Sequence, residues 1–114
     1  MESTDRVIAR GRLLSERTRL IEEIGAAIEV PEQMTYGSQA AAASQVFEQE
    51  RDLAMRERAS QHLEAVEAAL TRLENLSYGT CIRCGRAIAR ERLDALPWAA
   101  HCIECQSIVD RARR

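Results

Sequence analysis

The chain has 114 residues, a formal net charge of −2 and a pI near 5.7. This length suits a single domain, and the acidic balance argues against nonspecific nucleic-acid binding, which needs a basic domain. Charged residues make up 30% of the chain and aromatic residues only 4%, which favours long helices packed along a seam over a core rich in rings.

Localisation follows from what the sequence lacks. No apolar run approaches the roughly 20 residues that cross a bilayer. The N-terminal segment MESTDRVIARGRLLSERTRL is charged throughout and has no apolar signal-peptide core. We therefore expect a cytoplasmic protein with no membrane attachment. In that compartment disulfides are rare, so closely spaced cysteines more often bind metal or do redox chemistry.

Residues 5–30 are predicted to form a first helix, because their apolar side chains fall on one broad stripe. Gly11 and Gly25 weaken this helix by about 1 kcal/mol each relative to alanine. Val30 is its expected end, because Pro31 disfavours the helical conformation in the residue before it. The stripe consists of Val7, Ile8, Leu13, Leu14, Leu20, Ile21, Ile24, Ala27 and Ile28.

Residues 31–40, PEQMTYGSQA, are predicted to be a turn, and residues 41–77 a second helix of roughly 50 Å. Gly79 suits the left-handed conformation that commonly follows a helix, so the helix is expected to end near Tyr78. The apolar seam of this helix has the 4-3-4-3 spacing of a heptad pattern. It runs through Ala59, Leu63, Val66, Leu70 and Leu73.

Two amphipathic helices joined by a short turn are expected to pack as an antiparallel coiled-coil hairpin. The short turn favours pairing within one chain, so we expect a monomer, although a dimer through the exposed helix faces stays open. The fold class is thus mostly α. Residues 1–77 form the hairpin, with its tip near residues 31–43, and residues 78–114 form a small C-terminal module.

All four cysteines lie in that module, in the segment CIRCGRAIARERLDALPWAAHCIECQ. Cys81 and Cys84 form one Cys-x-x-Cys pair, and Cys102 and Cys105 form another, with 17 residues between the pairs. Each pair can turn two sulfurs towards one centre, and the spacer is long enough to fold back. Four thiolates at about 2.3 Å around one ion make a closed tetrahedral zinc site. The spacing therefore predicts one structural Zn²⁺.

Other uses of the cysteines are less well supported. A thioredoxin-like dithiol needs a βαβ context that this sequence lacks, disulfides are disfavoured in the cytosol, and a catalytic zinc needs an open coordination position. His101 adjoins Cys102 but is expected to be a surface or hydrogen-bonding residue, and His62 is expected to be solvated. Neither histidine has a nucleophile or acid partner nearby in sequence, so we expect no enzyme.

The metal is expected to supply much of the folding free energy of the module, because a segment this short has little core. Gly85 follows Cys84, where a tight turn needs conformational freedom. A short final helix is expected over residues 106–114. The small apolar cluster is expected to contain Ile82, Ile88, Leu93, Leu96 and Trp98, and the cations that could offset the thiolate charge are Arg83, Arg86, Arg90 and Arg92.

These residues resemble the DksA/TraR zinc-finger family. The similarity is specific over residues 78–106, where the pattern Tyr-Gly-x-Cys-x-x-Cys-Gly-x-x-Ile is followed by Arg-Leu-x-Ala-x-Pro and then Cys-Ile-x-Cys-Gln. It extends more loosely over the hairpin, including ASQVFEQERDLAMRERA at 43–59. The resemblance implies a C4-type zinc finger that ends in a short helix, carried at the base of a coiled-coil hairpin.

The resemblance also implies a function. Such proteins bind bacterial RNA polymerase, not DNA: the finger sits at the rim of the secondary channel, and the hairpin tip approaches the catalytic centre and regulates initiation. Family members carry an Asp-x-x-Asp-x-Ala motif at the tip. Alignment puts Ser38 and Ala41 at the two aspartates, while Ala43 keeps the alanine. The acidic tip is therefore missing, although these three positions remain the expected partner-binding site.

A second departure concerns guanosine tetraphosphate. Family members that respond to this nucleotide place basic residues just before the signature proline and just after the last cysteine, where this chain has Leu96 and Gln106. Without cations an anionic nucleotide has little reason to bind there, so we expect no response through that site. Two other functions stay open: a zinc-stapled helical adaptor for another protein partner, which the missing tip aspartates favour, and a DNA-binding finger, which the acidic balance disfavours.

Overall fold

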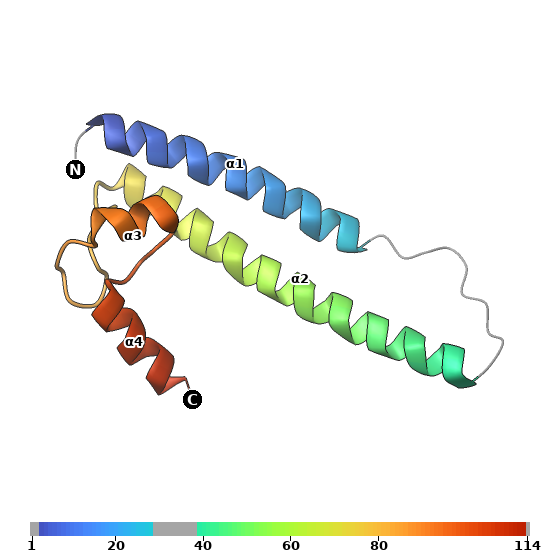
Figure 1. Cartoon of the computed structure of the whole chain (residues 1–114). Coiled ribbons are helices and arrows are strands. Elements are labelled where there is room, and N and C mark those ends of the chain that lie inside the picture. The colour runs from blue at the N-terminus through green and yellow to red at the C-terminus, as the bar shows by residue number, and fades with distance from the viewer. Residues whose placement is uncertain (1–2, 29–38, 114) are drawn as a thin grey trace.

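The computed structural model describes residues 3–28 and 39–113, in which four helices account for the regular structure. They are α1 (Ser3–Ile28), α2 (Gln39–Glu74), α3 (Arg90–Ala95) and α4 (Ile103–Ala112). Figure 1 shows α1 and α2 packed side by side as an antiparallel hairpin, with α3 and α4 at the end where α2 finishes. The mostly α fold with a helical hairpin is confirmed. None of the described helices is long and apolar enough to cross a membrane.

The predicted seam of α2 is the side that packs against α1. Ala59, Val66 and Leu73 are buried, and Leu63 and Leu70 are partly buried against the same core. Ala69, which the heptad pattern did not single out, is also fully buried. A small side chain at this position lets the two helix backbones approach closely.

The predicted stripe of α1 is too broad. Leu13 and Leu20 are buried and Ile24 is partly buried, together with Ala9, but the other apolar positions that can be described are exposed. A single partner helix covers only a narrow seam of about two positions per heptad, so the rest of the apolar surface stays outside it. The exposed members are Val7, Ile8, Leu14 and Ile21.

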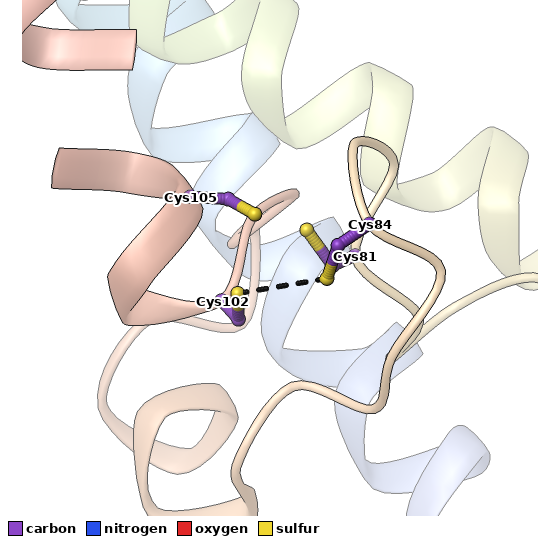
Figure 2. A group of neighbouring side chains, drawn as sticks. All are labelled: Cys81, Cys84, Cys102 and Cys105. Atoms are coloured by element: carbon purple, nitrogen blue, oxygen red, sulfur yellow. Dashed lines mark hydrogen bonds between the residues drawn. The ribbon is translucent and has the colours of Figure 1, made fainter. Parts of the chain in front are cut away.

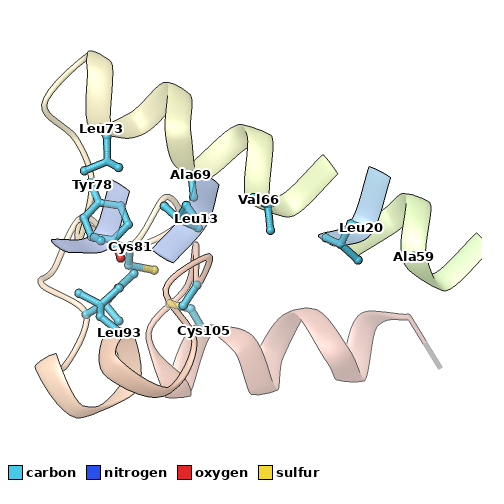
Figure 3. Close-up of a cluster of buried hydrophobic side chains, with 13 residues drawn as sticks. Leu13, Leu20, Ala59, Val66, Ala69, Leu73, Tyr78, Cys81, Leu93 and Cys105 are labelled. Carbon is cyan, nitrogen blue, oxygen red and sulfur yellow. The ribbon is translucent and has the colours of Figure 1, made fainter. Parts of the chain in front are cut away.

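A polar contact fixes the register of the hairpin. The Nε2 atom of His62 lies 3.2 Å from a carboxylate oxygen of Glu16, so these residues are level with each other. Figure 3 accordingly shows Leu20 near Ala59, one helical turn further along. A hydrogen bond from Arg19 is the largest cause holding the pKa of Glu16 below its usual value. His62 is only partly exposed, so the expectation of a solvated residue was wrong.

The end of α2 differs from the prediction. The helix stops at Glu74, and Leu76, with φ of +64°, takes the left-handed conformation that had been assigned to Gly79. Ser77 N–H donates to Arg72 O at 2.9 Å and Leu76 N–H to Leu73 O at 3.4 Å. This is the hydrogen-bond pattern of a Schellman cap. Gly79 is also left-handed, with φ of +87°, but it serves the turn that leads into the cysteines.

Other helix limits also shift. Gln39 is already helical, so the turn predicted over 31–40 extends too far. The last helix begins at Ile103, before the predicted start at residue 106, and α3 was not anticipated. The predicted end of the first helix at Val30 lies outside the described residues.

Candidate metal centre

Two short segments carry the four cysteines to one place. Cys81 and Cys84 lie in a loop that is closed by an isolated antiparallel bridge between Thr80 and Ala87. Cys102 immediately precedes α4. The last of the four, Cys105, lies in the first turn of α4, which begins three residues before the predicted start.

The first pair is held by a tight backbone turn. Cys81 N–H donates to Arg86 O at 2.8 Å, and Gly85 N–H donates back to Cys81 O at 3.0 Å. Gly85 has φ of +77°, a region in which a Cβ atom is strained. Ile88 N–H closes the base of the turn by donating to Gly79 O at 2.8 Å. The glycine after Cys84 therefore has the conformational role that its position predicted.

The second pair is positioned by the start of α4. Cys102 has extended backbone angles, with φ of −67° and ψ of 166°, and Gln106 N–H donates to Cys102 O at 2.9 Å. The positive end of the helix dipole thus lies beside the second cysteine pair. The two pairs are linked by a hydrogen bond from Ile82 N–H to Ala100 O at 2.9 Å.

The cluster has the dimensions of a zinc site. The four sulfurs all lie within 4.8 Å of one another, and none is joined in a disulfide. Cys84 Sγ and Cys102 Sγ are 3.8 Å apart, as Figure 2 shows. A regular tetrahedron with metal–sulfur bonds of about 2.3 Å has sulfur–sulfur edges of about 3.8 Å. The four cysteines are therefore positioned to hold one metal ion, as the spacing predicted.

The electrostatics of the cluster favour a bound cation. Burial opposes ionisation of the Cys81 thiol, but hydrogen bonds from backbone N–H groups, the first of them from Cys84, lower its pKa to about 5. At Cys105, a hydrogen bond from Arg83 favours the thiolate, but burial and the neighbouring sulfurs raise the pKa to about 12. The Cys81 thiol thus ionises readily, whereas the Cys105 thiol resists ionisation. Four thiolates in one cluster need a compensating positive charge, which a divalent ion supplies.

Only one of the four predicted arginines reaches a sulfur in the described structure. Arg83 donates to Cys105 Sγ at 3.7 Å. Arg90 pairs with Asp5 at 3.1 Å, and Arg92 donates to the backbone oxygen of His101 at 3.0 Å. The side chain of Arg86 makes no hydrogen bond or ion pair with the described residues. Arg90 and Arg92 therefore make structural contacts instead of neutralising the charge of the four sulfurs.

Side chains between helix α2 and the module fix the finger onto the hairpin. Tyr78 donates its hydroxyl hydrogen to Pro97 O at 2.8 Å within the core. Arg72 reaches the backbone oxygens of Trp98 and Ala99, both at 3.4 Å. The ring of Trp98 meets the ring of His62 edge-on at 4.2 Å between centroids. Trp98 is thus a packing residue, as predicted, whereas sequence reasoning missed the parts played by Arg72 and His62.

The apolar cluster of the finger is smaller than predicted. Ile88 and Leu93 are buried, and Leu96 and Trp98 are partly buried against the same core. Ile82 is 62% exposed, because its position between the first two cysteines points it away from the module. Because the finger buries few apolar side chains, metal binding must supply a larger share of its folding free energy.

The predicted tip residues are only partly described. Ser38 and the side chain of Ala41 lie outside the described part of the structure, although Ala41 belongs to α2. Ala43 is an exposed residue in the first turns of α2. The structure therefore leaves the partner-binding role of these three positions as a prediction.

Residues 76–111 match the family model described as the prokaryotic dksA/traR C4-type zinc finger. Similar curated proteins include the RNA polymerase-binding transcription factor DksA of Haemophilus influenzae, 34% identical over 68 residues. That match covers 60% of this chain and 47% of the relative. An uncharacterised protein of Aquifex aeolicus is 41% identical over 49 residues, which cover 43% of this chain and 34% of the relative. This chain thus spans about a third to a half of these relatives.

Solved structures extend the similarity to the hairpin. The structure of transcription factor DksA2 from Pseudomonas aeruginosa matches with a TM-score of 0.80 and 28% identity, covering 100% of this chain and 89% of that one. An RNA polymerase binding protein from Chlamydia trachomatis shares the fold, with a TM-score of 0.66 at 19% identity and coverage of 98% and 94%. Residues 76–111 thus match a C4-type zinc finger of the dksA/traR kind, and the whole chain shares the fold of DksA2.

Proposed function

We propose that this chain is a transcription regulator that binds bacterial RNA polymerase through its secondary channel. The observation that carries the proposal is the match of the whole chain to the DksA2 structure, in which the finger and the hairpin are both included. Curated relatives that share this finger are named RNA polymerase-binding transcription factors. A protein with this partner would act in the cytoplasm.

The shape of the molecule supports insertion into a channel. Helix α2 has 36 residues and is therefore about 54 Å long, and the finger packs beside the half of α2 that contains its C-terminus. The Trp98–His62 and Tyr78–Pro97 contacts hold the finger at this end. In the proposed complex the finger rests at the rim of the channel, while the far end of the hairpin reaches inward.

The site chemistry supports a structural role for the metal. Four cysteines complete a tetrahedral coordination shell and leave no position for a substrate or an activated water. We therefore assign no catalytic residue. Direct sequence-specific DNA binding is not part of the proposal either, because the chain carries a net charge of −2.

The non-acidic tip gives a second candidate function some weight. Ser38 and Ala41 stand where family members carry aspartates, so an effect that depends on tip carboxylates would be absent. A zinc-stapled helical adaptor that binds another protein with the same scaffold fits this departure. The two candidates differ in whether changes at Ser38, Ala41 and Ala43 alter transcription.

The expected lack of a nucleotide response also remains part of the proposal. Leu96 packs partly buried against the core, and Gln106 donates its side-chain N–H to Asp110 at 2.9 Å. Neither side chain offers a cation to a phosphate group. Guanosine tetraphosphate is therefore expected to leave the regulator's effect unchanged at this site.

Zinc-loaded protein is expected to co-purify with RNA polymerase core enzyme of a matched bacterium and to bind it at micromolar concentration or below. Pull-down and fluorescence anisotropy measure this binding, and native mass spectrometry confirms one zinc per chain in the same sample. Metal-stripped protein serves as the control and is expected to bind more weakly, because the finger that contacts the rim is no longer folded. Absence of binding at micromolar protein, with zinc confirmed, would overturn the proposal.

A further inference from the structure

The N-terminal end of α2 extends beyond its partner helix. Glu16 and His62 are level with each other, and both helices rise by about 1.5 Å per residue. Ile28, the last residue of α1, is therefore level with Glu50 of α2. Residues 39–49 continue for about 16 Å past the described end of α1, and Figure 1 shows this extension at the green end of α2. We call residues 39–49 the overhang.

The overhang carries little charge. Its sequence is QAAAASQVFEQ, in which Glu48 is the one charged residue, although charged residues make up 30% of the chain. Ser38 and Ala41, which align with the two tip aspartates of family members, supply no carboxylate either. The sequence of this end therefore offers a partner apolar contact and very few charges.

The overhang also presents the single phenylalanine of the chain to solvent. Phe47 is 72% exposed, and its neighbour Val46 is 52% exposed. Folding of the chain thus makes little use of the large apolar surface of this ring. Aromatic side chains are enriched at protein–protein interfaces, where such a surface becomes buried by the partner.

Phe47 points away from the seam of the hairpin. Among residues 42–50, Gln45 is the partly buried position and the others are exposed, so the seam continues through Gln45. Phe47 lies two positions further on, or about 200° around a helix of 3.6 residues per turn. Ala43 lies one turn before Phe47 and shares its face. The ring therefore projects from the outer side of the overhang, next to a predicted partner-binding position.

We propose that Phe47 anchors the overhang in an apolar pocket of the channel wall of RNA polymerase. This inference rests on the proposed function, which brings this end of the rod into the channel. The wall of a channel surrounds an inserted rod, and the outward-facing ring of Phe47 is the largest apolar side chain that the overhang presents to it. Aromatic anchors that become fully buried carry much of the binding energy of an interface. In this chain, apolar contact at Phe47 replaces contact through tip carboxylates.

Fluorescence anisotropy with RNA polymerase of a matched bacterium tests the anchor. Phe47→Ala in zinc-loaded protein is expected to weaken binding by about tenfold or more, because no ring enters the pocket. Phe47→Leu keeps a large apolar side chain and is expected to lose less than about threefold. The control is Leu53→Ala, which removes a side chain that is 53% exposed in the part of α2 flanked by α1. It is expected to bind like wild type.

Urea unfolding of the free protein separates an anchor from a core residue. Wild type and Phe47→Ala are expected to be almost equally stable, because the ring is exposed before binding. A large loss of stability would place the ring inside the fold and overturn the anchor. Wild type that fails to bind polymerase overturns the proposed function and the anchor together. Wild type that binds, with Phe47→Ala binding equally well or Leu53→Ala weakened as much as Phe47→Ala, overturns the anchor alone.

Discussion

Cys81→Ser is expected to release the zinc and unfold the finger while the hairpin keeps much of its helix. Cys81 is only 1% exposed and belongs both to the metal cluster and to the small core beneath it. Structural zinc in comparable sites contributes about 10–16 kcal/mol to folding. The few buried side chains of the finger cannot replace this contribution, so losing one thiolate removes most of its stability.

Native mass spectrometry measures the metal, and Trp98 reports on the finger. Trp98 is the single tryptophan of the chain and lies against His62, so its emission is expected to shift towards that of a solvated indole when the finger detaches. Ser107→Ala, an exposed change in α4, is the matched control and is expected to keep one zinc. Full zinc retention by Cys81→Ser and Cys102→Ser alike would contradict the four-cysteine site.

Leu13→Ala is expected to destabilise the hairpin by about 2–5 kcal/mol. Leu13 is fully buried, at 0% exposure, in the seam with Val66 and Ala69. Truncation removes apolar contact and leaves a cavity that two long helices cannot close without shifting their register. Urea unfolding of zinc-loaded protein, followed by circular dichroism, measures the loss.

Leu53→Ala provides the matched comparison, because the same side chain is removed from a position that is 53% exposed in α2. Its expected cost is less than about 1 kcal/mol. If both variants lost the same stability, the seam would not be where the hairpin derives its packing energy. The comparison thus tests the core assignment apart from helix propensity, which changes in the same direction in both variants.

The metal centre could be predicted from the sequence because its geometry depends on local spacing. A Cys-x-x-Cys pair brings two sulfurs together whatever surrounds it, and Gly85 marks the turn that this requires. The seam of α2 was predictable for a similar reason, since heptad spacing selects one face of a helix. In both cases the deciding pattern is a spacing of a few residues along the chain, although the contacts it leads to join distant segments.

Features that depend on contacts with residues distant in the sequence were harder to predict. The predicted stripe of α1 included Val7 and Leu14 because apolar periodicity does not reveal how much of the helix surface the partner helix will bury. His62 appeared solvated because its partners, Glu16 and Trp98, are distant in sequence. Leu76 in the left-handed conformation went unrecognised because this role normally falls to glycine.

In vitro transcription with matched RNA polymerase tests the central claim most directly, by comparing wild type with an Ala43→Lys variant at saturating, zinc-loaded protein. We expect wild type to change the lifetime of promoter complexes. The variant is expected still to bind polymerase but to lose much of this effect, because a bulky cation at Ala43 would disturb the tip within the channel. A wild type that binds polymerase without changing transcription, or a variant indistinguishable from it, would contradict insertion of the tip.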